Sequence, residues 1–362
     1  MAVSSADEPA DPADLVFVTL QVQRQLDAFV SVQRARLEPL GPDLVPFLDA
    51  AQSYVRGGKR LRPAYCFWGW RAAGGEATEE RVLTASAALE WLQGSALVHD
   101  DVMDGSDTRR GVPSAHRAFA ARHGEHGWHG DAAAFGAGTA ILLGDLMLSW
   151  ADEMYRSSGL PLTAAAAPYL DACKTEVVAG QVLDLVEQAR ATGTVEAAMR
   201  VVRFKSAKYT VERPLHLGAA LAGADQELLA ALTAFGLPVG EAFQLRDDVL
   251  GVFGEPARTG KPAGDDLREG KRTVLLARAL EGADPPGREL LRRHVGDRGL
   301  SDVAVARLRT VIVGSGALDA VEQQIDALMA QARAALAAAP LHDERAREAL
   351  GSLASRSVDR HS

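Results

Sequence analysis

The chain has 362 residues and a net charge of -9 at pH 7, with 47% hydrophobic and 24% charged residues. This composition predicts a globular protein with a sizeable core, and the negative charge argues against a nucleic-acid partner, whose phosphates it would repel. No segment approaches the roughly 18 unbroken apolar residues of a membrane span. Residues 1–14 lack the features of a secretion signal and are expected to be a disordered tail. Cys66 and Cys173 form no spaced pattern, so we expect reduced thiols in a cytoplasmic protein.

Helical periodicity begins directly after this tail. Apolar residues recur at spacings of three and four over Leu15–Leu37 and over Val82–Val98, which predicts two amphipathic helices. Thr78 precedes two glutamates, an arrangement typical of an N-cap and an acidic first turn. We therefore expect the second helix to start just after Thr78.

Long apolar runs continue through the rest of the chain. Asp131–Trp150 and Thr194–Leu221 each open on a residue suited to an N-cap. Strand-like alternation is absent, and the Gly/Pro-rich breaks are all too short to be domain linkers. The sequence predicts an all-α protein with one large helical domain over 15–355, flanked by tails at 1–14 and 356–362.

The segment His-Asp-Asp-Val-Met-Asp ends one of these apolar helices. Asp100 and Asp104 are four residues apart, so they share a helix face. Like charges at this spacing repel, and a hard divalent cation with oxygen ligands would offset the cost. A solvated acidic helix end is the alternative, although the helix dipole disfavours carboxylates there. Arg109 and Arg110 follow, which suits a diphosphate shared between magnesium and guanidinium groups.

A second acidic cluster lies on a helix expected over Val239–Val252. Gln244 and Asp247 are three apart and share a face, with Asp248 beside them. Two acidic faces far apart in sequence can clamp a ligand through metal ions. A Gly/Pro-rich loop follows and carries Lys261, Asp265, Asp266 and Lys271. A solvated charged loop is the alternative for that segment taken by itself.

Basic residues form two further clusters. Lys59 and Arg62 follow a glycine pair, and glycines let the backbone approach an anion closely. A basic surface turn is the alternative. Lys205 and Lys208 lie inside an apolar helical run, where a lysine is costly unless it reaches solvent or meets an anion. These clusters supply the positive charge that an anionic substrate of this acidic protein requires.

Together these segments resemble the trans-isoprenyl diphosphate synthases, or polyprenyl synthetases. The motifs GGKRLRP, HDDVMDGSDTRRG, FKSAKYT, FQLRDD and GKPAGDDLREGKRT occur in the family's order over Gly57–Thr273. Their style is most similar to actinobacterial geranylgeranyl diphosphate synthases. The resemblance implies an all-α fold around a deep central cavity, a homodimer, and magnesium, with three ions when substrate is bound.

The resemblance also implies roles for individual residues. The catalytic residues would be Asp100, Asp101, Asp104, Arg109, Lys205, Asp247 and Asp248. Of these, the magnesium ligands would be Asp100, Asp104 and Asp247, with Asp266 contributing through water. Contacts to isopentenyl diphosphate would come from Lys59, Arg62, Gln93 and Arg110. Contacts to the allylic diphosphate would come from Arg109, Lys205, Ser206, Gln244, Lys261 and Lys271.

Two positions depart from the family's pattern. Gly251 stands where the second motif usually has its third aspartate, which leaves the outer part of that metal site undefined. Ser206 replaces the more common threonine and keeps the hydroxyl.

The reaction implied is a prenyl transfer. The allylic diphosphate would ionise and the double bond of isopentenyl diphosphate would attack the cation, so no side-chain nucleophile is needed. The chain should grow along the helix that bears Asp100. Ser95 and Ala96 are small, which argues against a farnesyl stop, and Leu92, or Trp91 from the side, could form a deeper floor. Geranylgeranyl diphosphate is the predicted product.

Two other functions fit part of the pattern. A class I terpene cyclase ionises similar diphosphates, but it would not need the isopentenyl site that Lys59, Arg62 and Arg110 suggest. A non-catalytic partner subunit of a prenyl synthase tends to lose its aspartate motifs, whereas the first is intact here. The His/Gly-rich stretch 123–130 is expected to be a polar loop, because nothing rigid fixes ligand geometry there.

Overall fold

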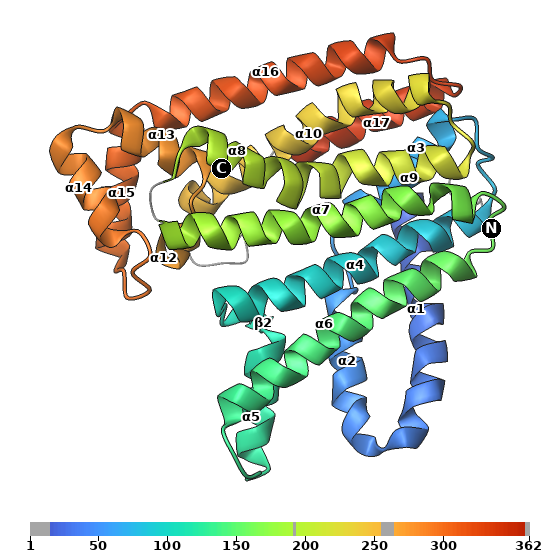
Figure 1. Cartoon of the computed structure of the whole chain (residues 1–362), viewed down its shortest axis with the longest axis horizontal. Coiled ribbons are helices and arrows are strands. Elements are labelled where there is room, and N and C mark those ends of the chain that lie inside the picture. The colour runs from blue at the N-terminus through green and yellow to red at the C-terminus, as the bar shows by residue number, and fades with distance from the viewer. Residues whose placement is uncertain (1–14, 191–192, 255–263, 359–362) are drawn as a thin grey trace, which may run out of the picture.

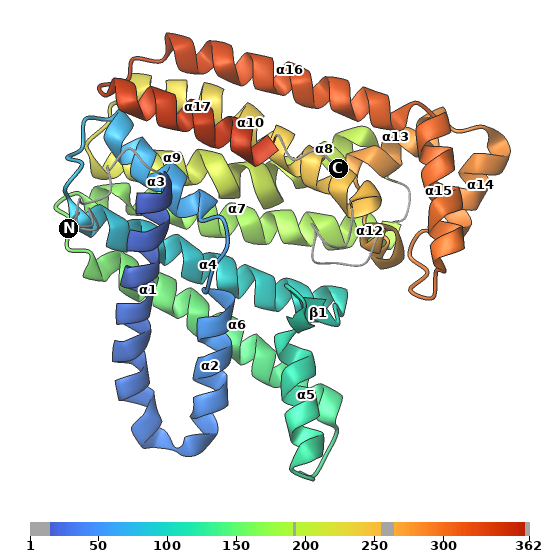
Figure 2. The same ribbon diagram turned by 180° about the vertical axis from the view of Figure 1, so that it is seen from behind.

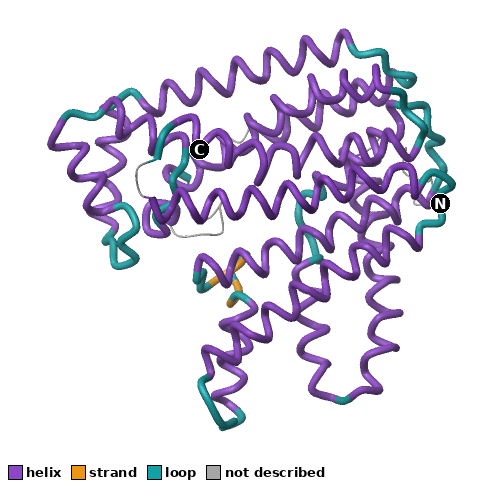
Figure 3. Tube along the Cα trace, viewed as in Figure 1, coloured by secondary structure: helices purple, strands orange, loops and turns teal. Residues whose placement is uncertain are grey.

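The computed structural model describes residues 15–190, 193–254 and 264–358, and this part of the chain is almost entirely helical (Figure 3). The two strands found there, β1 (Thr108–Arg109) and β2 (Val112–Pro113), form one short antiparallel hairpin. The predicted all-α fold is therefore confirmed.

The first two α-helices, α1 (Leu15–Leu37) and α2 (Val45–Tyr54), project together from the body of the protein (Figure 2). Two short 3-10 helices, η1 (Glu38–Leu40) and η2 (Pro42–Leu44), make the turn between them. The side chains at 18, 22, 26 and 30 of α1 are buried, which is the four-residue spacing of one helix face. The range predicted for α1 is confirmed.

Helix α4 (Glu80–Asp104) is the central helix, with α3 (Leu61–Ala72) and α6 (Ala132–Ser157) packed against it. Its N-cap is Glu79 rather than the predicted Thr78. The Glu79 carboxylate accepts a hydrogen bond from the Arg81 backbone N–H at 3.1 Å and pairs with the Arg81 side chain. Because the Glu79 carboxylate also pairs with Arg81, Glu79 caps the helix instead of Thr78.

Helix α6 starts as predicted, since the Asp131 carboxylate accepts a hydrogen bond from the Ala134 N–H at 2.7 Å. Helix α5 (Ala115–Glu125) precedes it, and the two form a projecting corner (Figure 1). Gly144 of α6 packs directly against the His99 ring of α4, so these two helices approach closely.

The next segment carries three consecutive helices after α7 (Thr163–Arg190). Thr194 caps α8 (Val195–Val201) as predicted, accepting a hydrogen bond from Ala197 N–H at 3.1 Å. The chain then widens into a π-helix, η3 (Val202–Glu212), before α9 (Arg213–Leu221). π-Helical turns are rare and are frequently found at functional sites.

Helix α10 (Gln226–Phe253) is longer than predicted. It begins at the Asp225 N-cap, and Pro238 lies inside it rather than before its start. Proline usually ends or kinks a helix, so the sequence favoured a start at Val239; the tight packing of α10 against η3 and α16 tolerates the lost hydrogen bond.

Two glycines bring η3 into backbone contact with its neighbours. A Cβ at Gly180 of α7 would lie 2.3 Å from the Lys205 backbone nitrogen, and one at Gly240 of α10 would lie 2.6 Å from the Ala207 carbonyl oxygen. Only glycine fits at either contact. The π-helix is therefore held between α7 and α10 with no side chain separating the backbones.

The C-terminal third packs over one end and one side of α10. Its helices are α12 (Asp265–Glu269), α13 (Val274–Gly282), α14 (Pro285–His294), α15 (Asp302–Gly314), α16 (Ala317–Ala338) and α17 (Glu344–Val358). Helix α17 continues three residues past the predicted domain end at 355. Ser357 and Val358 are buried, which explains why the helix extends into the predicted tail.

Two helices, α6 and α10, are long and apolar enough to cross a membrane by length and composition alone. Most of the relevant window of α10 is buried inside the fold, and less of that of α6. Core helices pass the same test, so this is weak support for a span. Cys66 and Cys173 are free and buried.

Candidate active site

A cavity of about 620 Å³ lies between α3, α4, α6, α7, η3 and α10. Asp100 of α4 and Asp247 of α10 both line it, although they are far apart in sequence. Much of the remaining wall is apolar and includes Leu148, Val177 and Val182. The cavity thus combines a charged end with a hydrophobic interior, as a ligand with a charged head and an apolar tail requires.

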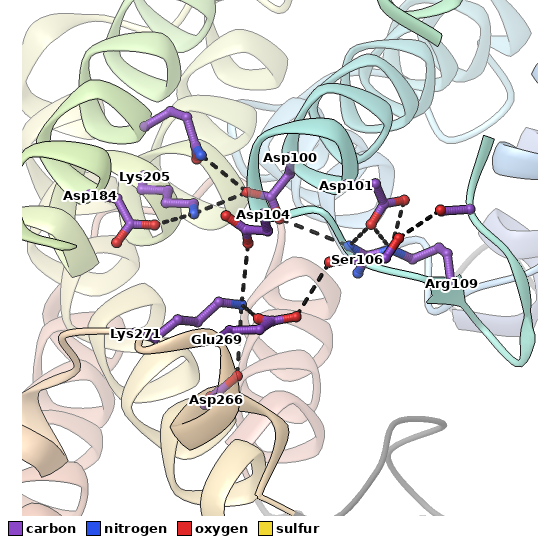
Figure 4. A network of polar contacts seen from close by, with 12 residues as sticks. Asp100, Asp101, Asp104, Ser106, Arg109, Asp184, Lys205, Asp266, Glu269 and Lys271 are labelled. Carbon is purple, nitrogen blue, oxygen red and sulfur yellow. Dashed lines mark hydrogen bonds and ion pairs between the residues drawn. The ribbon is translucent and has the colours of Figure 1, made fainter. Parts of the chain in front are cut away.

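The first acidic motif occupies the last turn of α4 (Figure 4). Gln181 Nε2 donates a hydrogen bond to Asp100 Oδ1 at 3.1 Å, and Lys205 Nζ lies 3.2 Å from the same oxygen. Asp104 Oδ2 lies 3.8 Å from Lys271 Nζ. The two aspartates therefore share one face with two lysines that come from other parts of the chain.

The two carboxylates of this motif differ in acidity. Burial would raise the pKa of Asp100, but Lys205, Lys271 and Arg109 outweigh it and hold the pKa below its ordinary value. The pKa of Asp104 is raised to about 6, first by burial and then by the Asp100 charge. Burial and mutual repulsion thus disfavour ionisation of both carboxylates together, and a further cation would stabilise the ionised pair.

Asp101 has a different environment from its neighbours. It is fully buried and is not part of the cavity wall. Arg109 donates from Nε to Asp101 Oδ1 at 3.0 Å and also from a terminal nitrogen, and the Tyr54 hydroxyl donates to Oδ2 at 3.0 Å. Arg109 Nη2 lies 3.9 Å from Asp100. Asp101 therefore fixes Arg109 beside the cavity instead of facing a ligand.

The second acidic motif presents Asp247 to the cavity and buries Asp248. Gln244 lines the cavity and donates from Nε2 to Asp248 Oδ1 at 2.7 Å. Burial raises the pKa of Asp248 well above its ordinary value. Gln244 and Asp247 share the face of α10 that lines the cavity, as the spacing predicted, while Asp248 supports Gln244 from behind.

Gly251, which replaces the usual third aspartate, leaves room for a carboxylate from another helix. A Cβ at position 251 would lie 1.8 Å from Asp266 Oδ2 of α12. Lys271 Nζ lies 3.7 Å from Asp266 Oδ1 and 2.9 Å from Glu269 Oε2. An aspartate at position 251 would collide with Asp266 in its present position. The glycine at 251 and the location of the Asp266 carboxylate are therefore linked.

The predicted allylic-side cations gather at this end of the cavity. Lys205 and Ser206 of η3 line the cavity, and Lys271 lies between the carboxylates of Asp104 and Asp266. Nearby carboxylates raise the pKa of Lys271 well above its ordinary value against the effect of burial, which would lower it. Lys261 lies outside the described residues.

The predicted isopentenyl-side residues lie toward α3. Arg62 lines the cavity, stacks 4.2 Å over the Tyr209 ring and donates to Thr210 Oγ1 at 2.8 Å. The Tyr209 hydroxyl donates to Gln93 Oε1 at 2.9 Å, so Arg62 and Gln93 meet through Tyr209.

The glycine-pair loop lies beside the second arginine of the first motif. Gly58 approaches the Arg110 guanidinium, and Arg110 donates to the Arg56 carbonyl at 2.8 Å. Lys59 is adjacent in sequence but does not line the cavity. Arg60 is buried against Glu90, so it supports the fold rather than facing a ligand.

Sequence reasoning missed two polar residues at the charged end. Gln181 donates to Asp100, and Asp184 Oδ2 lies 2.6 Å from Lys205 Nζ. They are three apart on α7 and so share a face. The available signal was a pair of polar side chains interrupting an apolar run at helical spacing.

Magnesium fits this end of the cavity when a diphosphate shares its coordination. Among the described residues no group of three or more His, Cys, Asp or Glu side chains is close enough to hold a metal ion alone. Magnesium commonly takes only one or two carboxylates, with waters and substrate phosphates as its other ligands. Helix α4 offers the pair Asp100 and Asp104, and helix α10 offers Asp247, so each side supplies the one or two carboxylates that an ion needs.

An all-α fold with two carboxylate-bearing helices at one end of an apolar cavity defines an isoprenoid-synthase type of protein. Residues 46–311 match the polyprenyl synthetase family, and the chain belongs to that family. It is a trans-prenyltransferase, as predicted from the motifs.

Individual relatives agree with this assignment. The crystal structure of a geranylgeranyl pyrophosphate synthase from Corynebacterium glutamicum, complexed with isoprenyl diphosphate and magnesium, is 43% identical. It superposes with a TM-score of 0.92 over 96% of this chain and 100% of the other. A geranylfarnesyl diphosphate synthase from Aeropyrum pernix is 33% identical over 84% of this chain and 91% of its own. A geranylgeranyl diphosphate synthase from Saccharolobus solfataricus is 31% identical over 68% and 69%.

Proposed function

We propose that this chain condenses isopentenyl diphosphate with an allylic diphosphate and releases geranylgeranyl diphosphate as its main product. One observation carries the proposal: Asp100 and Asp247, from two distant helices, line one cavity whose far wall is apolar. The similarity to the C. glutamicum geranylgeranyl pyrophosphate synthase supports the choice of product.

The allylic diphosphate is expected at the charged end. Lys205, Lys271 and Arg109 converge there, and fixed cations stabilise the negative charge that develops on a departing diphosphate. Magnesium, held by Asp100, Asp104 and Asp247 and numbering three ions with substrate bound, would act as a Lewis acid on the same oxygens. Gln181 and Asp184 hold Asp100 and Lys205 in place.

Isopentenyl diphosphate is expected on the α3 side, where Arg62 and Gln93 face the cavity and Lys59 and Arg110 lie nearby. Its double bond attacks the allylic carbon as the carbon–oxygen bond to diphosphate breaks. A proton then leaves the new tertiary cation for the released diphosphate, which restores an alkene. The apolar wall excludes the water that would quench the cation.

The α4 wall of the cavity supports a product longer than farnesyl diphosphate. Ser95 and Ala96 line the cavity beneath Asp100, and their small side chains do not narrow it. Leu92 also lines the cavity and lies one turn deeper. Leu92 is nearly fully buried, which suits a floor residue. These three positions are our proposed length determinants on α4.

A homodimer and a cytoplasmic location complete the proposal. Large apolar side chains that do not line the cavity are exposed on α6, notably Leu142 at 63% and Phe135 at 38%. An exposed apolar face of this kind marks an interaction surface. A second copy of the chain would cover it.

A product assay tests the function. The purified full chain is incubated with magnesium, isopentenyl diphosphate and one primer at a time: dimethylallyl, geranyl or farnesyl diphosphate. We expect geranylgeranyl diphosphate from all three, and no product after chelation of the metal. Turnover of an allylic diphosphate without isopentenyl diphosphate would indicate a cyclase instead, and no turnover at all would indicate a partner subunit.

The mass of the protein in solution tests the dimer. Leu142→Glu places a charge on the exposed face of α6 and should shift the protein toward a monomer. Val303→Glu changes a side chain of 66% exposure on α15 and serves as the matched control. A wild-type monomer would refute this part of the proposal.

A further inference from the structure

One cation lies in the wall of the cavity away from the charged end. Lys174 of α7 lines the cavity together with apolar residues such as Val177 and Leu148. Its ammonium group lies 2.8 Å from Asp152 Oδ1 of α6 and 3.0 Å from Asp171 Oδ1 of its own helix. The reaction described above makes no use of these three residues.

The position of Lys174 along α7 places it at the deep end of the cavity. Gln181 contacts Asp100 at the charged end, and Lys174 is seven residues earlier on the same helix. At ~1.5 Å rise per residue, this puts Lys174 about 10 Å below the level of Asp100.

The contacts of α6 with α4 give the same depth for Asp152. His99 contacts the Ile141 carbonyl near the charged end, whereas Trp91 and Trp150 meet edge to face further down, with ring centroids 5.0 Å apart. Asp152 follows Trp150 by two residues, so it lies at or just below the level of Leu92. The Lys174–Asp152 ion pair therefore spans from α7 to α6 at the floor of the cavity.

We propose that the Lys174–Asp152 ion pair is a polar stop that, together with Leu92, sets the longest product that this enzyme makes. The proposal rests on the proposed prenyl-transfer function and adds the residues on α6 and α7 that limit its product. Leu92 closes the deep end from α4, and the ion pair closes it from the opposite side.

The chemistry of the pair makes it a firmer stop than an apolar side chain. A growing prenyl chain that reaches Lys174 would strip water from an ammonium–carboxylate pair and give it no hydrogen bond in return. An apolar floor, by contrast, would gain contact with each added methylene group. Two carboxylates hold the Lys174 ammonium group at the cavity wall, where a growing chain would meet it.

Lys174→Met tests the proposal, since methionine keeps an unbranched side chain but removes the charge. The readout is the product-length distribution with farnesyl diphosphate as primer, compared with synthetic standards. We expect the ratio of products one isoprene unit longer to the wild-type product to rise on the order of tenfold. Lys174→Arg keeps both ion pairs and should keep the wild-type distribution.

Arg36→Met is the matched control. It removes an ion pair to Glu153, the residue next to Asp152, on the side of α6 that faces α1. Its product distribution should equal that of the wild type. Lengthening in Arg36→Met as large as in Lys174→Met would show a general loosening of α6 and would overturn the proposal.

An unchanged distribution in Lys174→Met also overturns it. If circular dichroism shows that Lys174→Met does not fold, Asp152→Asn decides the question with the same readout and the same two outcomes. Failure of the wild type to elongate any primer would refute the prenyl-transfer function itself. An active wild type with the same product lengths in the variants would refute only the polar stop.

Discussion

The two acidic helices supply carboxylates to one cavity in different ways. Helix α4 presents Asp100 and Asp104 from its own last turn, so the first site is contained in five consecutive residues. Helix α10 presents Asp247, and the place of a further carboxylate beside it is taken by Asp266 from α12. A site that looks incomplete along the sequence can therefore be completed by another segment in space.

The largest expected effect comes from removing the charge that each helix presents to the cavity. Asp100→Asn and Asp247→Asn should each lower kcat at least about 10²-fold, because each loses a group that helps to stabilise the departing diphosphate. Steady-state kinetics with geranyl diphosphate as primer measures this. Asp326→Asn on the exposed face of α16 is the control, and an equal loss there would contradict the assignment.

Asp266→Asn should lower kcat/KM roughly ten- to hundredfold, the range found when a supporting ligand of a metal site is lost. If Asp266 completes the second site, the loss should be smaller at saturating magnesium than at low magnesium. A magnesium titration of the activity measures this, and a loss that is independent of magnesium would argue against the link to the metal.

Gly251→Ala tests the same region by sterics alone. The new Cβ would collide with Asp266 Oδ2, so we expect activity to fall about tenfold through displacement of that carboxylate. Gly138→Ala, on α6 with open space around it, is the matched control and should raise the melting temperature slightly. Full activity in Gly251→Ala would show that the position of Asp266 does not matter.

The smallest effect should come from Asp248→Asn. The side chain is buried behind Gln244, and an asparagine oxygen can accept the same hydrogen bond. We expect kcat within about threefold of the wild type, because the hydrogen bond from Gln244 is retained and a single hydrogen bond contributes little to stability. A loss as large as that of Asp247→Asn would show that Asp248 acts on the ligand directly.

Much of the site could be predicted because helical spacing fixes which residues share a face. Asp100 with Asp104, and Gln244 with Asp247, follow from spacings of four and three. The N-caps Asp131 and Thr194 follow from residue type. These features depend on the local chain only.

The remainder depends on contacts between distant segments. That Asp101 holds Arg109 instead of facing the cavity requires Tyr54, whose position on α2 no local pattern gives. The pairing of Gly251 with Asp266 requires the packing of α12 on α10. The start of α10 before Pro238 reflects tertiary packing that offsets a local preference.

The backbone contacts at Gly180 and Gly240 have a mechanical consequence. Because no flexible side chain cushions η3 on either side, this segment cannot slide or rotate without carrying α7 and α10 with it. The backbone that carries Lys205 is thus held at a fixed height relative to α7 and to the acidic helix α10. The cation that meets the diphosphate is therefore already in position, and the protein needs little reorganisation when the carbon–oxygen bond to diphosphate breaks.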